Sequence, residues 1–428
     1  MEKIRLKEIA NIYNGSTPST KDEDNFDGDI IWITPKDLST QNKKYISKGE
    51  RNITNKGLQQ INSPLLPKGT ILISSRAPIG LISIANRELV TNQGFKNIVV
   101  NKNIADNEYL YYNFKNRISD LEKLGSGTTF KEISKSSIEL FEINLPSLET
   151  QQKIAKILSD IDDKIEVLHQ INDNLAELAK TIYDYWFVQF DFPDQNGKPY
   201  KTSGGKMVYN EVLKREIPEG WEVCTFSNLI KDIKNGDWGK EQEEVNYTEK
   251  VSCIRGADIN GLNGNGELKS PIRYINKKNK CKILVENDFI IEISGGSPTQ
   301  STGRIALLTS NTFSRFENNI ICSNFCKAIS LKDEKYTFFF LKEWERLYHN
   351  NILFSFEGKT SGIKNFLFEA FIHTYPIISP QKSIIEKYNF YNIKVDENKQ
   401  KNLQQIQHLQ SLRDWLLPML MNGQISVE

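Results

Sequence analysis

The sequence lacks any apolar run that approaches the ~20 residues needed to cross a bilayer. Its first residues, Met1-Glu2-Lys3-Ile4-Arg5, are charged where a signal peptide would become apolar. These two absences argue against a membrane protein and an exported one. We therefore expect a cytoplasmic protein that does not contact membranes.

Cysteine is scarce, with five residues that all lie in the second half of the chain. An odd number in a large chain without an export signal argues against a disulfide framework. Cys322-x₃-Cys326 has the proximity of a zinc-ligand pair, but its neighbours are strand-like and no CxxC or nearby histidine completes a site. We expect reduced, buried thiols and no metal.

The chain also lacks an excess of charge of one sign, because 55 Lys and Arg face 54 Asp and Glu. It is therefore unlike a protein that holds nucleic acid by bulk charge alone. The balance is uneven along the chain, since residues 149–190 contain 4 basic and 8 acidic side chains whereas residues 380–417 contain 6 and 4. Opposite signs favour pairing between these two segments.

An internal repeat organises the 428 residues, a length typical of two or three domains. The segment Pro146-Ser-Leu-Glu-Thr-Gln151 aligns with Pro376-Ile-Ile-Ser-Pro-Gln381, and the match continues without a gap for about forty residues. Further upstream, Asn14-Gly15 corresponds to Asn235-Gly236. The segment Trp32-Ile-Thr-Pro-Lys-Asp-Leu38 corresponds to Cys253-Ile-Arg-Gly-Ala-Asp-Ile259. Each copy is thus a variable globular domain followed by a long segment of fixed length.

The globular parts are β-rich, because their short β-branched runs end at Gly, Pro or Asn. Such runs are residues 69–74, 81–85, 97–101, 288–294 and 305–308. Helical spacing of aromatic and aliphatic residues predicts two helices, 107–124 and 336–348.

The segments of fixed length are predicted to be coiled-coil helices, because apolar residues follow a 4-3 alternation. The seam of the first is Ile154, Leu158, Ile161, Ile165, Leu168, Asn172, Leu175, Ala179, Ile182 and Trp186. The seam of the second is weaker in its middle: Ile384, Tyr388, Tyr391, Val395, Asn398, Asn402, Gln405, Leu409, Leu412 and Leu416. Ser379-Pro380 is expected to begin this helix, and Pro418 and Gly423 to end it.

Asn172 and Asn402 occupy the same position in the two copies. A polar residue in such a seam usually fixes the register at a cost in stability, and a loosely packed, hydrated middle section is the alternative. The turn-rich residues 191–220 form a linker between the copies that is too short for a domain.

Catalytic motifs are incomplete. Phe356-Glu-Gly-Lys-Thr360 resembles the end of a phosphate loop, but Leu353 stands where that loop needs glycine. Asp288 and Glu292 suggest a nuclease pair, yet Ser294 replaces the expected lysine, and a capped buried strand explains them better. The four histidines are scattered, and no methyltransferase motif is present. The sequence indicates a protein without an active site.

The duplicated order of these segments, closed by the tail Leu412-Arg-Asp-Trp-Leu-Leu-Pro-Met-Leu-Met-Asn-Gly-Gln424, resembles the DNA-specificity subunit of type I restriction-modification systems over the whole chain. The resemblance also rests on the segments Trp32–Leu38, Leu66-Pro-Lys-Gly-Thr-Ile-Leu-Ile-Ser74 and Pro146–Ala155. The resemblance implies an α+β fold with two target-recognition domains related by pseudo-twofold symmetry and joined by two antiparallel coiled-coil helices. The corresponding boundaries are 1–148 and 221–379 for the domains, 149–190 and 380–417 for the helices, 191–220 for the linker and 418–428 for the tail.

The resemblance also implies that each domain recognises half of a bipartite, asymmetric site in double-stranded DNA. Two methyltransferase subunits would dock on the helices and bring S-adenosylmethionine, and motor-nuclease subunits would use ATP and magnesium. No cofactor is expected in this chain. The degraded motif at Cys253–Ala257 and the longer loop at Ser294–Gly303 imply that the two domains recognise different sequences.

Side chains that recognise base edges are expected to be polar or basic and to lie on loops beside strand ends or glycines. In the first domain these candidates are Thr34, Lys36, Ser75, Arg76, Asn92, Gln93, Thr128, Thr129 and Lys131. In the second they are Arg255, Ser297, Thr299, Gln300, Lys359, Thr360 and Lys364. Each of them can instead be a turn former or a solvated surface residue.

Two other interpretations remain open at this point. A fragment of a DNA-modifying enzyme would need a methyltransferase motif or nuclease carboxylates in this chain. A coiled-coil scaffold whose β-rich domains bind protein or carbohydrate would fit the same architecture without any contact to DNA.

Overall fold

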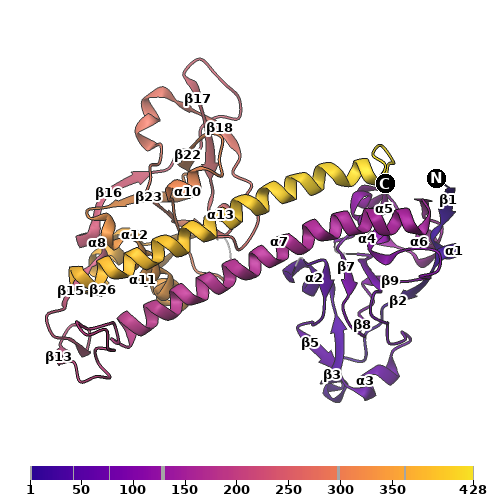
Figure 1. Cartoon of the computed structure of the whole chain (residues 1–428), viewed down its shortest axis with the longest axis horizontal. Helices are drawn as coiled ribbons and strands as arrows, with labels where there is room; N and C mark the ends of the chain where they lie inside the picture. The colour runs from indigo at the N-terminus through magenta and orange to yellow at the C-terminus, as the bar shows by residue number, and fades with distance from the viewer. Residues whose placement is uncertain are drawn as a thin grey trace. The chain divides into compact units, whose positions relative to one another are not determined.

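A computed structural model describes residues 2–41, 43–76, 78–126, 131–295, 299–360 and 363–427. The chain divides into two compact units, which are described separately (Figure 1). Unit 1 contains residues 1–166 and 408–428, and unit 2 contains residues 167–407. Each unit therefore combines one β-rich part with segments of both long helices.

Unit 1 is built on a five-stranded sheet with the order β2-β9-β6-β7-β4 and a three-stranded sheet with the order β5-β3-β8. The strands of the first sheet are β2 (Ala10–Asn14), β9 (Phe95–Val100), β6 (Ile71–Ser74), β7 (Ile82–Ala85) and β4 (Tyr45–Ile46). Those of the second are β5 (Arg51–Ile53), β3 (Phe26–Ile33) and β8 (Val90–Thr91). Strand β1 (Glu2–Arg5) pairs with β12 (Glu142–Leu145), so the first and last strands of the domain close on each other.

Short helices cover these sheets. The helices are α1 (Leu6–Ile9), α2 (Pro35–Gln41), α3 (Asn55–Gln60), α4 (Asn107–Asn116), α5 (Ile118–Lys123) and α6 (Lys135–Glu139). The single helix expected at 107–124 is in fact two, because Arg117 leaves the helical conformation with φ −119° and ψ 31°. Its guanidinium donates to the carbonyl of Glu142 at 2.6 Å, which ties this break to strand β12.

Unit 2 repeats most of this topology, with a four-stranded sheet of order β16-β23-β19-β21 and a three-stranded sheet of order β18-β17-β22. The strands are β16 (Ile230–Asn235), β23 (Cys326–Leu331), β19 (Phe289–Glu292), β21 (Ile305–Leu307), β18 (Ile272–Asn276), β17 (Tyr247–Ile254) and β22 (Asn319–Cys322). Strand β15 (Glu222–Thr225) pairs with β26 (Pro376–Ser379) as β1 pairs with β12. The internal repeat of the sequence is therefore also a repeat of strand pairing.

The helices of unit 2 are α8 (Phe226–Leu229), α9 (Ile259–Leu262), α10 (Ser310–Phe313), α11 (Thr337–His349) and α12 (Phe368–Thr374). The expected helix at 336–348 corresponds to α11, which is rich in aromatic residues. Its Trp344 is fully buried and donates its indole N–H to the carbonyl of Gly303 at 2.8 Å. The rings of Phe226 and Phe371 pack against this indole at centroid distances of 5.2 and 5.1 Å.

Residues 191–220 contain more structure than the expected linker. Strands β13 (Met207–Asn210) and β14 (Arg215–Pro218) form a hairpin. The ring of Phe192 stacks on that of Trp221 at a centroid distance of 5.0 Å, within the core of unit 2. The segment is thus anchored by aromatic packing, a feature that its Gly- and Pro-rich composition did not predict.

Two long helices contribute to both units. Helix α7 (Leu148–Tyr183) continues into one π-helical turn at Asp184–Val188, and helix α13 extends over Lys382–Met421. In unit 2, Asn172 contacts Asn402 and Tyr183 contacts Tyr388, so the two helices run antiparallel there. In unit 1 the end of α13 joins the beginning of α7 in one hydrophobic core.

The seam predicted on α7 is confirmed. Seven of its ten members, Ile154, Leu158, Ile165, Leu168, Asn172, Ala179 and Trp186, are buried, and Ile161, Leu175 and Ile182 are half-buried.

The seam predicted on α13 is correct at its beginning, where Ile384 and Tyr388 are buried, and wrong in its middle. Four predicted members, Tyr391, Asn398, Gln405 and Leu412, are exposed, while Asn402, Leu409 and Leu416 are half-buried. The buried positions include Asn392, Gln400, Leu403 and Ile406. The helix also passes through Pro418 to Met421, so Pro418 does not end it.

Contacts with the β-rich part of unit 2 explain why residues other than the predicted seam are buried in the middle of α13. Half-buried Arg315 donates to Gln400 Oε1 at 2.9 Å, and Thr309 donates to Asp396 Oδ2 at 2.8 Å. Burial lowers the pKa of Arg315 to about 10 and raises that of Asp396. Polar residues of the β-rich part therefore decide which face of α13 is buried. A heptad pattern of apolar residues cannot predict such polar contacts.

The predicted asparagine pair lies in the contact between the helices. Asn402 Nδ2 donates to Asn172 Oδ1 at 2.8 Å, and Asn172 Nδ2 donates to the carbonyl of Lys399 at 3.3 Å. Because Asn172 is buried, the substitution Asn402→Ala leaves its carbonyl oxygen without this donor. We expect a loss of about 1–3 kcal/mol in the free energy of unfolding, measured by chemical denaturation.

Asn398→Ala is the matched control, because Asn398 is exposed on the same helix, and its cost should stay below about 0.5 kcal/mol. Replacing both Asn172 and Asn402 by Leu should cost less than Asn402→Ala, since no unpaired polar atom remains. Equal denaturation midpoints for Asn402→Ala and Asn398→Ala would contradict a stabilising pair.

Candidate nucleic-acid interface

Several loops of unit 1 that contain predicted DNA-contacting residues lie against one another. We call residues 15–17, 33–36, 75–76, 91–94 and 131–133 the first loop cluster. The amide of Asn92 donates to the carbonyl of Ile33 at 2.9 Å, and the amide of Ser75 donates to the carbonyl of Gly94 at 2.7 Å. A Cβ atom on Gly15 would lie 1.8 Å from the carbonyl oxygen of Asn92, so only glycine permits this approach.

Unit 2 repeats these contacts in what we call the second loop cluster, residues 236–238, 254–256, 293–294, 323–325 and 364–366. The amide of Ser323 donates to the carbonyl of Ile254 at 2.8 Å, and the amide of Ile293 donates to the carbonyl of Phe325 at 2.8 Å. A Cβ on Gly236 would lie 1.9 Å from the carbonyl oxygen of Ser323. The same backbone framework therefore positions the loops of both copies.

Buried aspartates fix one loop of each cluster. Asp37 Oδ2 accepts from the amide and hydroxyl of Thr34 at 2.7 and 2.6 Å. Asp258 Oδ2 accepts from the amide of Arg255 at 3.0 Å and from its Nε at 2.8 Å. The hydrogen bond to Asp258 raises the pKa of Arg255. The sequence did contain a signal for these aspartates, since they align in the repeat, but they were not singled out.

The other predicted residues of unit 1 differ in accessibility. Lys131 is exposed, and the ammonium of Lys36 is exposed and paired with Glu50 at 2.6 Å. Arg76 lies 3.7 Å from Glu132, which also pairs with the buried Lys96.

Three more of these residues are held by the loops themselves. Asn92 Oδ1 accepts from the amide of Gly94 at 2.9 Å, and Gln93 accepts from the hydroxyl of Thr17. Ser75 is fully buried, so its hydroxyl is not on the surface in this conformation. Thr128 and Thr129 lie outside the described residues.

In unit 2 the antiparallel strands β20 (Ser294–Gly295), β25 (Ile363–Phe366) and β24 (Glu357–Thr360) bring the predicted loop regions together. Lys364 is largely covered, because its ammonium pairs with Glu357 at 3.1 Å and lies 4.7 Å from the centre of the Phe354 ring. Thr299 and Gln300 are exposed. The side chains of Lys359 and Thr360, and the whole of Ser297, lie outside the described parts of the chain.

Some surface features near the second loop cluster escaped the sequence analysis. Phe325 is 55% exposed at the turn between β22 and β23, and Asn324 beside it is also exposed. The basic run Lys277-Lys-Asn-Lys-Cys-Lys282 is close by, since Lys282 Nζ donates to the carbonyl of Gly236 at 3.2 Å. This run was visible in the sequence as four lysines within six residues, whereas nothing in the sequence marks Phe325 as exposed.

The carboxylates considered as a nuclease pair are engaged in structural ion pairs. Asp288 accepts from Lys234 at 2.9 Å and from the amide of Val285 at 2.9 Å. Glu292 forms two hydrogen bonds with Arg304, at 2.8 and 2.5 Å. Both carboxylates are buried in or beside strand β19, as the interpretation of a capped strand expects.

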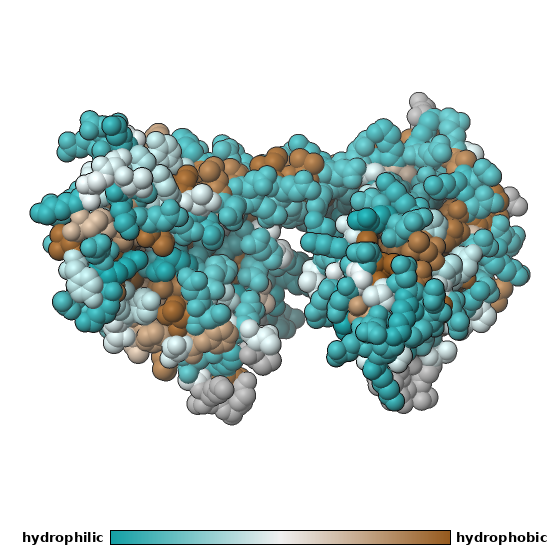
Figure 2. Space-filling view, turned by 90° about the horizontal axis from the view of Figure 1, so that it is seen from below, coloured by the Kyte–Doolittle hydropathy of each residue, from teal (hydrophilic) through white to brown (hydrophobic). Residues whose placement is uncertain are grey.

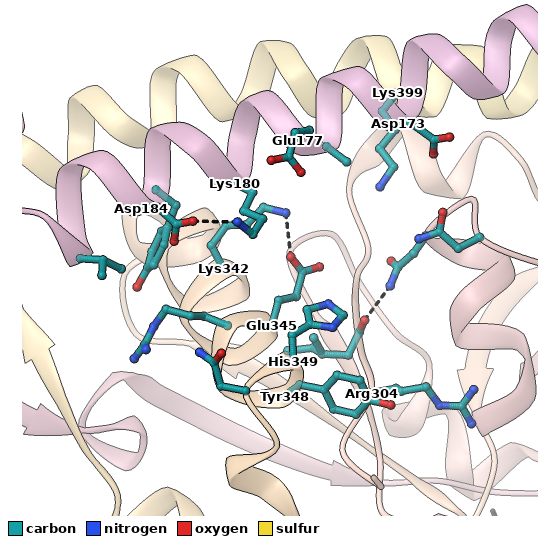
Figure 3. A pocket seen from close by; sticks show the side chains of 18 of the residues that line it. Asp173, Glu177, Lys180, Asp184, Arg304, Lys342, Glu345, Tyr348, His349 and Lys399 are labelled. Atoms are coloured by element: carbon teal, nitrogen blue, oxygen red, sulfur yellow. Dashed lines mark hydrogen bonds and ion pairs between the residues drawn. The ribbon is translucent and has the colours of Figure 1, made fainter. Parts of the chain in front are cut away.

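A cavity of about 620 Å³ in unit 2 lies between α7, α11 and α13 (Figure 3). Most cations that line it are already paired, as Lys342 is with Glu345 at 2.7 Å and Lys180 with Asp184 at 2.8 Å. Lys399 points into the cavity from α13 (Figure 3), and burial lowers its pKa. Because both signs of charge are present and largely neutralise each other, the lining selects no class of ligand.

The thiols at Cys322 and Cys326 act as small buried groups, as expected. Cys322 Sγ donates to the carbonyl of Cys326 at 3.8 Å, and Ser323 Oγ donates to Cys326 Sγ at 3.9 Å. Within the described residues, no group of three or more His, Cys, Asp or Glu side chains is arranged to hold a metal ion. Over the same residues, no helix is both long and apolar enough to cross a membrane.

Fold and site together define a protein with two copies of one β-rich domain, each with a cluster of polar loops, and with two long helices. The family described as "Type I restriction modification DNA specificity domain" matches residues 1–177. The type I restriction enzyme MjaIX specificity subunit of Methanocaldococcus jannaschii is 34% identical, over 99% of this chain and 93% of that protein. The HindI specificity subunit of Haemophilus influenzae is 24% identical, over 84% and 87%.

The crystal structure of a type I restriction-modification S subunit from M. genitalium has the same fold, with a TM-score of 0.59 and 16% identity over 98% of this chain and 95% of that one. The chain belongs to the family of type I restriction-modification specificity subunits. Members of this family are non-catalytic subunits of an enzyme complex, and their function is DNA target recognition.

Burial of the thiols predicts which cysteines react in the folded protein. Burial raises the pKa of Cys253 and Cys322 to about 12 and that of Cys326 well above its usual value. At pH 8 the thiolate fraction of the first two is then roughly one in ten thousand. We expect iodoacetamide to modify exposed Cys281 and to leave these three unmodified, as measured by peptide mass spectrometry.

Denatured protein is the control, because all five cysteines should react after unfolding. Modification of Cys322 or Cys326 at the rate of Cys281 in the folded protein would contradict the buried, protonated state.

Proposed function

We propose that this chain recognises a bipartite, asymmetric sequence in double-stranded DNA, with one half-site bound by each loop cluster. The observation that carries the proposal is the repeat of one backbone framework, around Gly15 and Gly236, that presents different side chains in the two copies. A common framework with different side chains suits two half-sites of unlike sequence.

Within each cluster we assign base contacts to predicted residues that are accessible. In unit 1 these are Lys36, Arg76, Gln93 and Lys131, and in unit 2 they are Arg255, Thr299 and Gln300. Ser75 and Lys364 are covered and are better suited to supporting these loops. The lysines of the run 277–282 are suited to phosphate contacts, because a mobile ammonium contributes charge without sequence preference.

We further propose that methyltransferase subunits bind the long helices. Hydrophobic patches interrupt a largely hydrophilic surface on the face shown in Figure 2. On α7 the exposed residues Val167, Ile171, Leu178 and Tyr185 recur at helical spacing and lie apart from the buried seam. An exposed apolar stripe of this kind is typical of a protein interface.

The reactions of such a complex would belong to the partners. The methyltransferase would bring S-adenosylmethionine, and restriction subunits would use ATP and magnesium, in the cytoplasm where the chromosome of the cell is exposed to them. A scaffold that binds protein or carbohydrate remains the competing function, and it predicts no sequence-selective retention of DNA by the complex.

Exchange of one domain tests the bipartite recognition. Replacing residues 1–145 by the corresponding domain of a relative, in a strain that supplies the methyltransferase, should change one half of the methylated motif and leave the other half intact. Sequencing of methylated bases measures this, and the chain without its partner is the control, in which no methylation should occur. A motif that changes in both halves, or in neither, would contradict modular recognition.

A single charge tests the docking surface. The side chain of Leu178 is 50% exposed, so Leu178→Glu should leave folding intact and weaken co-purification with the methyltransferase at least tenfold. Lys180→Glu is the matched control, because at 100° per residue it places the same side chain on the opposite side of α7. The melting temperature monitors folding in both variants. Equal retention of the partner by Leu178→Glu and Lys180→Glu would contradict docking at this stripe.

A further inference from the structure

The exposed residue Phe325 lies in a hydrogen-bonded turn. Its carbonyl accepts from the amides of Ile293 at 2.8 Å and Ser294 at 3.3 Å, and the amide of Cys326 donates to the carbonyl of Ser323 at 2.9 Å. The buried thiol of Cys326 packs beneath the same turn. A single exposed apolar residue is ordinary on a protein surface, so exposure alone assigns Phe325 no role.

The turn that contains Phe325 belongs to the second loop cluster, and this position suggests a role for the exposed side chain. Ser323 bonds to the end of strand β17, directly before Arg255, while Phe325 bonds to Ser294 at the beginning of β20. Ser294 in turn donates its hydroxyl to Asn365 at 2.6 Å. Phe325 is thus linked on both sides to loops that contain polar candidates for base contacts.

The other copy has no side chain at this position. Gly94 is the counterpart of Phe325, because its carbonyl accepts from the amide of Ser75 as that of Phe325 accepts from Ile293. A Cβ on Gly94 would lie 3.0 Å from Pro35 Cγ and 3.0 Å from Asn92 Oδ1, which is crowded. The repeat aligns Pro35 with Gly256, so the second copy lacks the ring that limits the first.

The paired differences at these two positions therefore leave more room for a side chain in the second copy than in the first. The side chain that fills it is a large aromatic one, although the surrounding loops are polar. Phe325 is 55% exposed, so roughly half of its surface is already covered in the folded chain. The ring can therefore touch the edge of a base pair but is poorly suited to insertion between two base pairs, which would require both faces to be free.

We propose that Phe325 is a specificity-determining residue that contacts the 5-methyl group of a thymine in the second half-site. This inference rests on the proposed DNA recognition. In the major groove the thymine methyl is the one apolar group on a base edge, and an aromatic side chain is a suitable partner for it. The first half-site receives no equivalent contact, because Gly94 stands in its place.

The test uses the complete chain with its methyltransferase partner and duplexes that contain the methylated motif. Each thymine of the motif is replaced in turn by deoxyuridine, which removes only the methyl group. For the wild type we expect roughly fourfold weaker binding at one thymine of the second half-site, from ~0.8 kcal/mol per buried methyl. Phe325→Ala should bind all these duplexes equally, and Phe325→Leu should keep part of the discrimination.

Val245→Ala is the matched control, because Val245 is a 94% exposed apolar residue of the same unit outside the loop cluster, and it should retain the wild-type ratio. Melting temperatures show whether each variant is folded. The proposal is overturned if the second half-site contains no thymine, if Phe325→Ala keeps the fourfold ratio, or if it weakens binding to motif and unrelated DNA alike. A wild-type complex that binds no DNA selectively would instead refute the proposed function itself.

Discussion

The close approach of a glycine to a neighbouring carbonyl is the constraint on which both loop clusters depend. Gly15 and Gly236 end the first strand of each main sheet, and each lies so near to the carbonyl of Asn92 or Ser323 that any side chain would collide with it. This contact holds the loop after β2 against the loop before β9 in unit 1. In unit 2 it holds the loop after β16 against the loop before β23. The remaining loops then attach by backbone hydrogen bonds, so their side chains are free to vary without loss of the framework.

Much of this architecture could be predicted because the sequence is duplicated, so that each motif and spacing pattern occurs in two copies that can be compared. The repeat, the β-rich domains and the seam of α7 followed from periodicity and alignment, since each depends on local pattern. The seam of α13 did not, because Arg315 and Thr309 on the domain decide which polar face of the helix turns inward. The split between α4 and α5 likewise depends on Arg117 contacting strand β12, which is distant in sequence.

The sequence predicted which loops form the candidate site, but only partly which of their side chains are accessible. The loops that the sequence marked do come together, because strand ends and glycines determine where loops lie. Whether a polar side chain is accessible depends on partners that the sequence does not identify. Ser75 is buried and Lys364 is largely covered in its ion pair with Glu357, whereas Arg255 stays accessible although Asp258 holds it. Phe325 was missed for the converse reason, since an apolar residue between two strands is expected to be buried.

The differences between the copies suggest how such a framework acquires a new target. Asp37 and Asp258 keep the same capping role, whereas the residues they cap, Thr34 and Arg255, differ in size and charge. A Cβ on Gly94 would lie 3.0 Å from Pro35 Cγ in one copy, whereas the aligned residues of the other copy are Phe325 and Gly256. Substitutions at such coupled positions favour one another, because a side chain at position 94 would press against Pro35 unless that ring shifts by a few tenths of an ångström. Changes in recognition are therefore expected to arise by paired substitutions around an unchanged backbone contact.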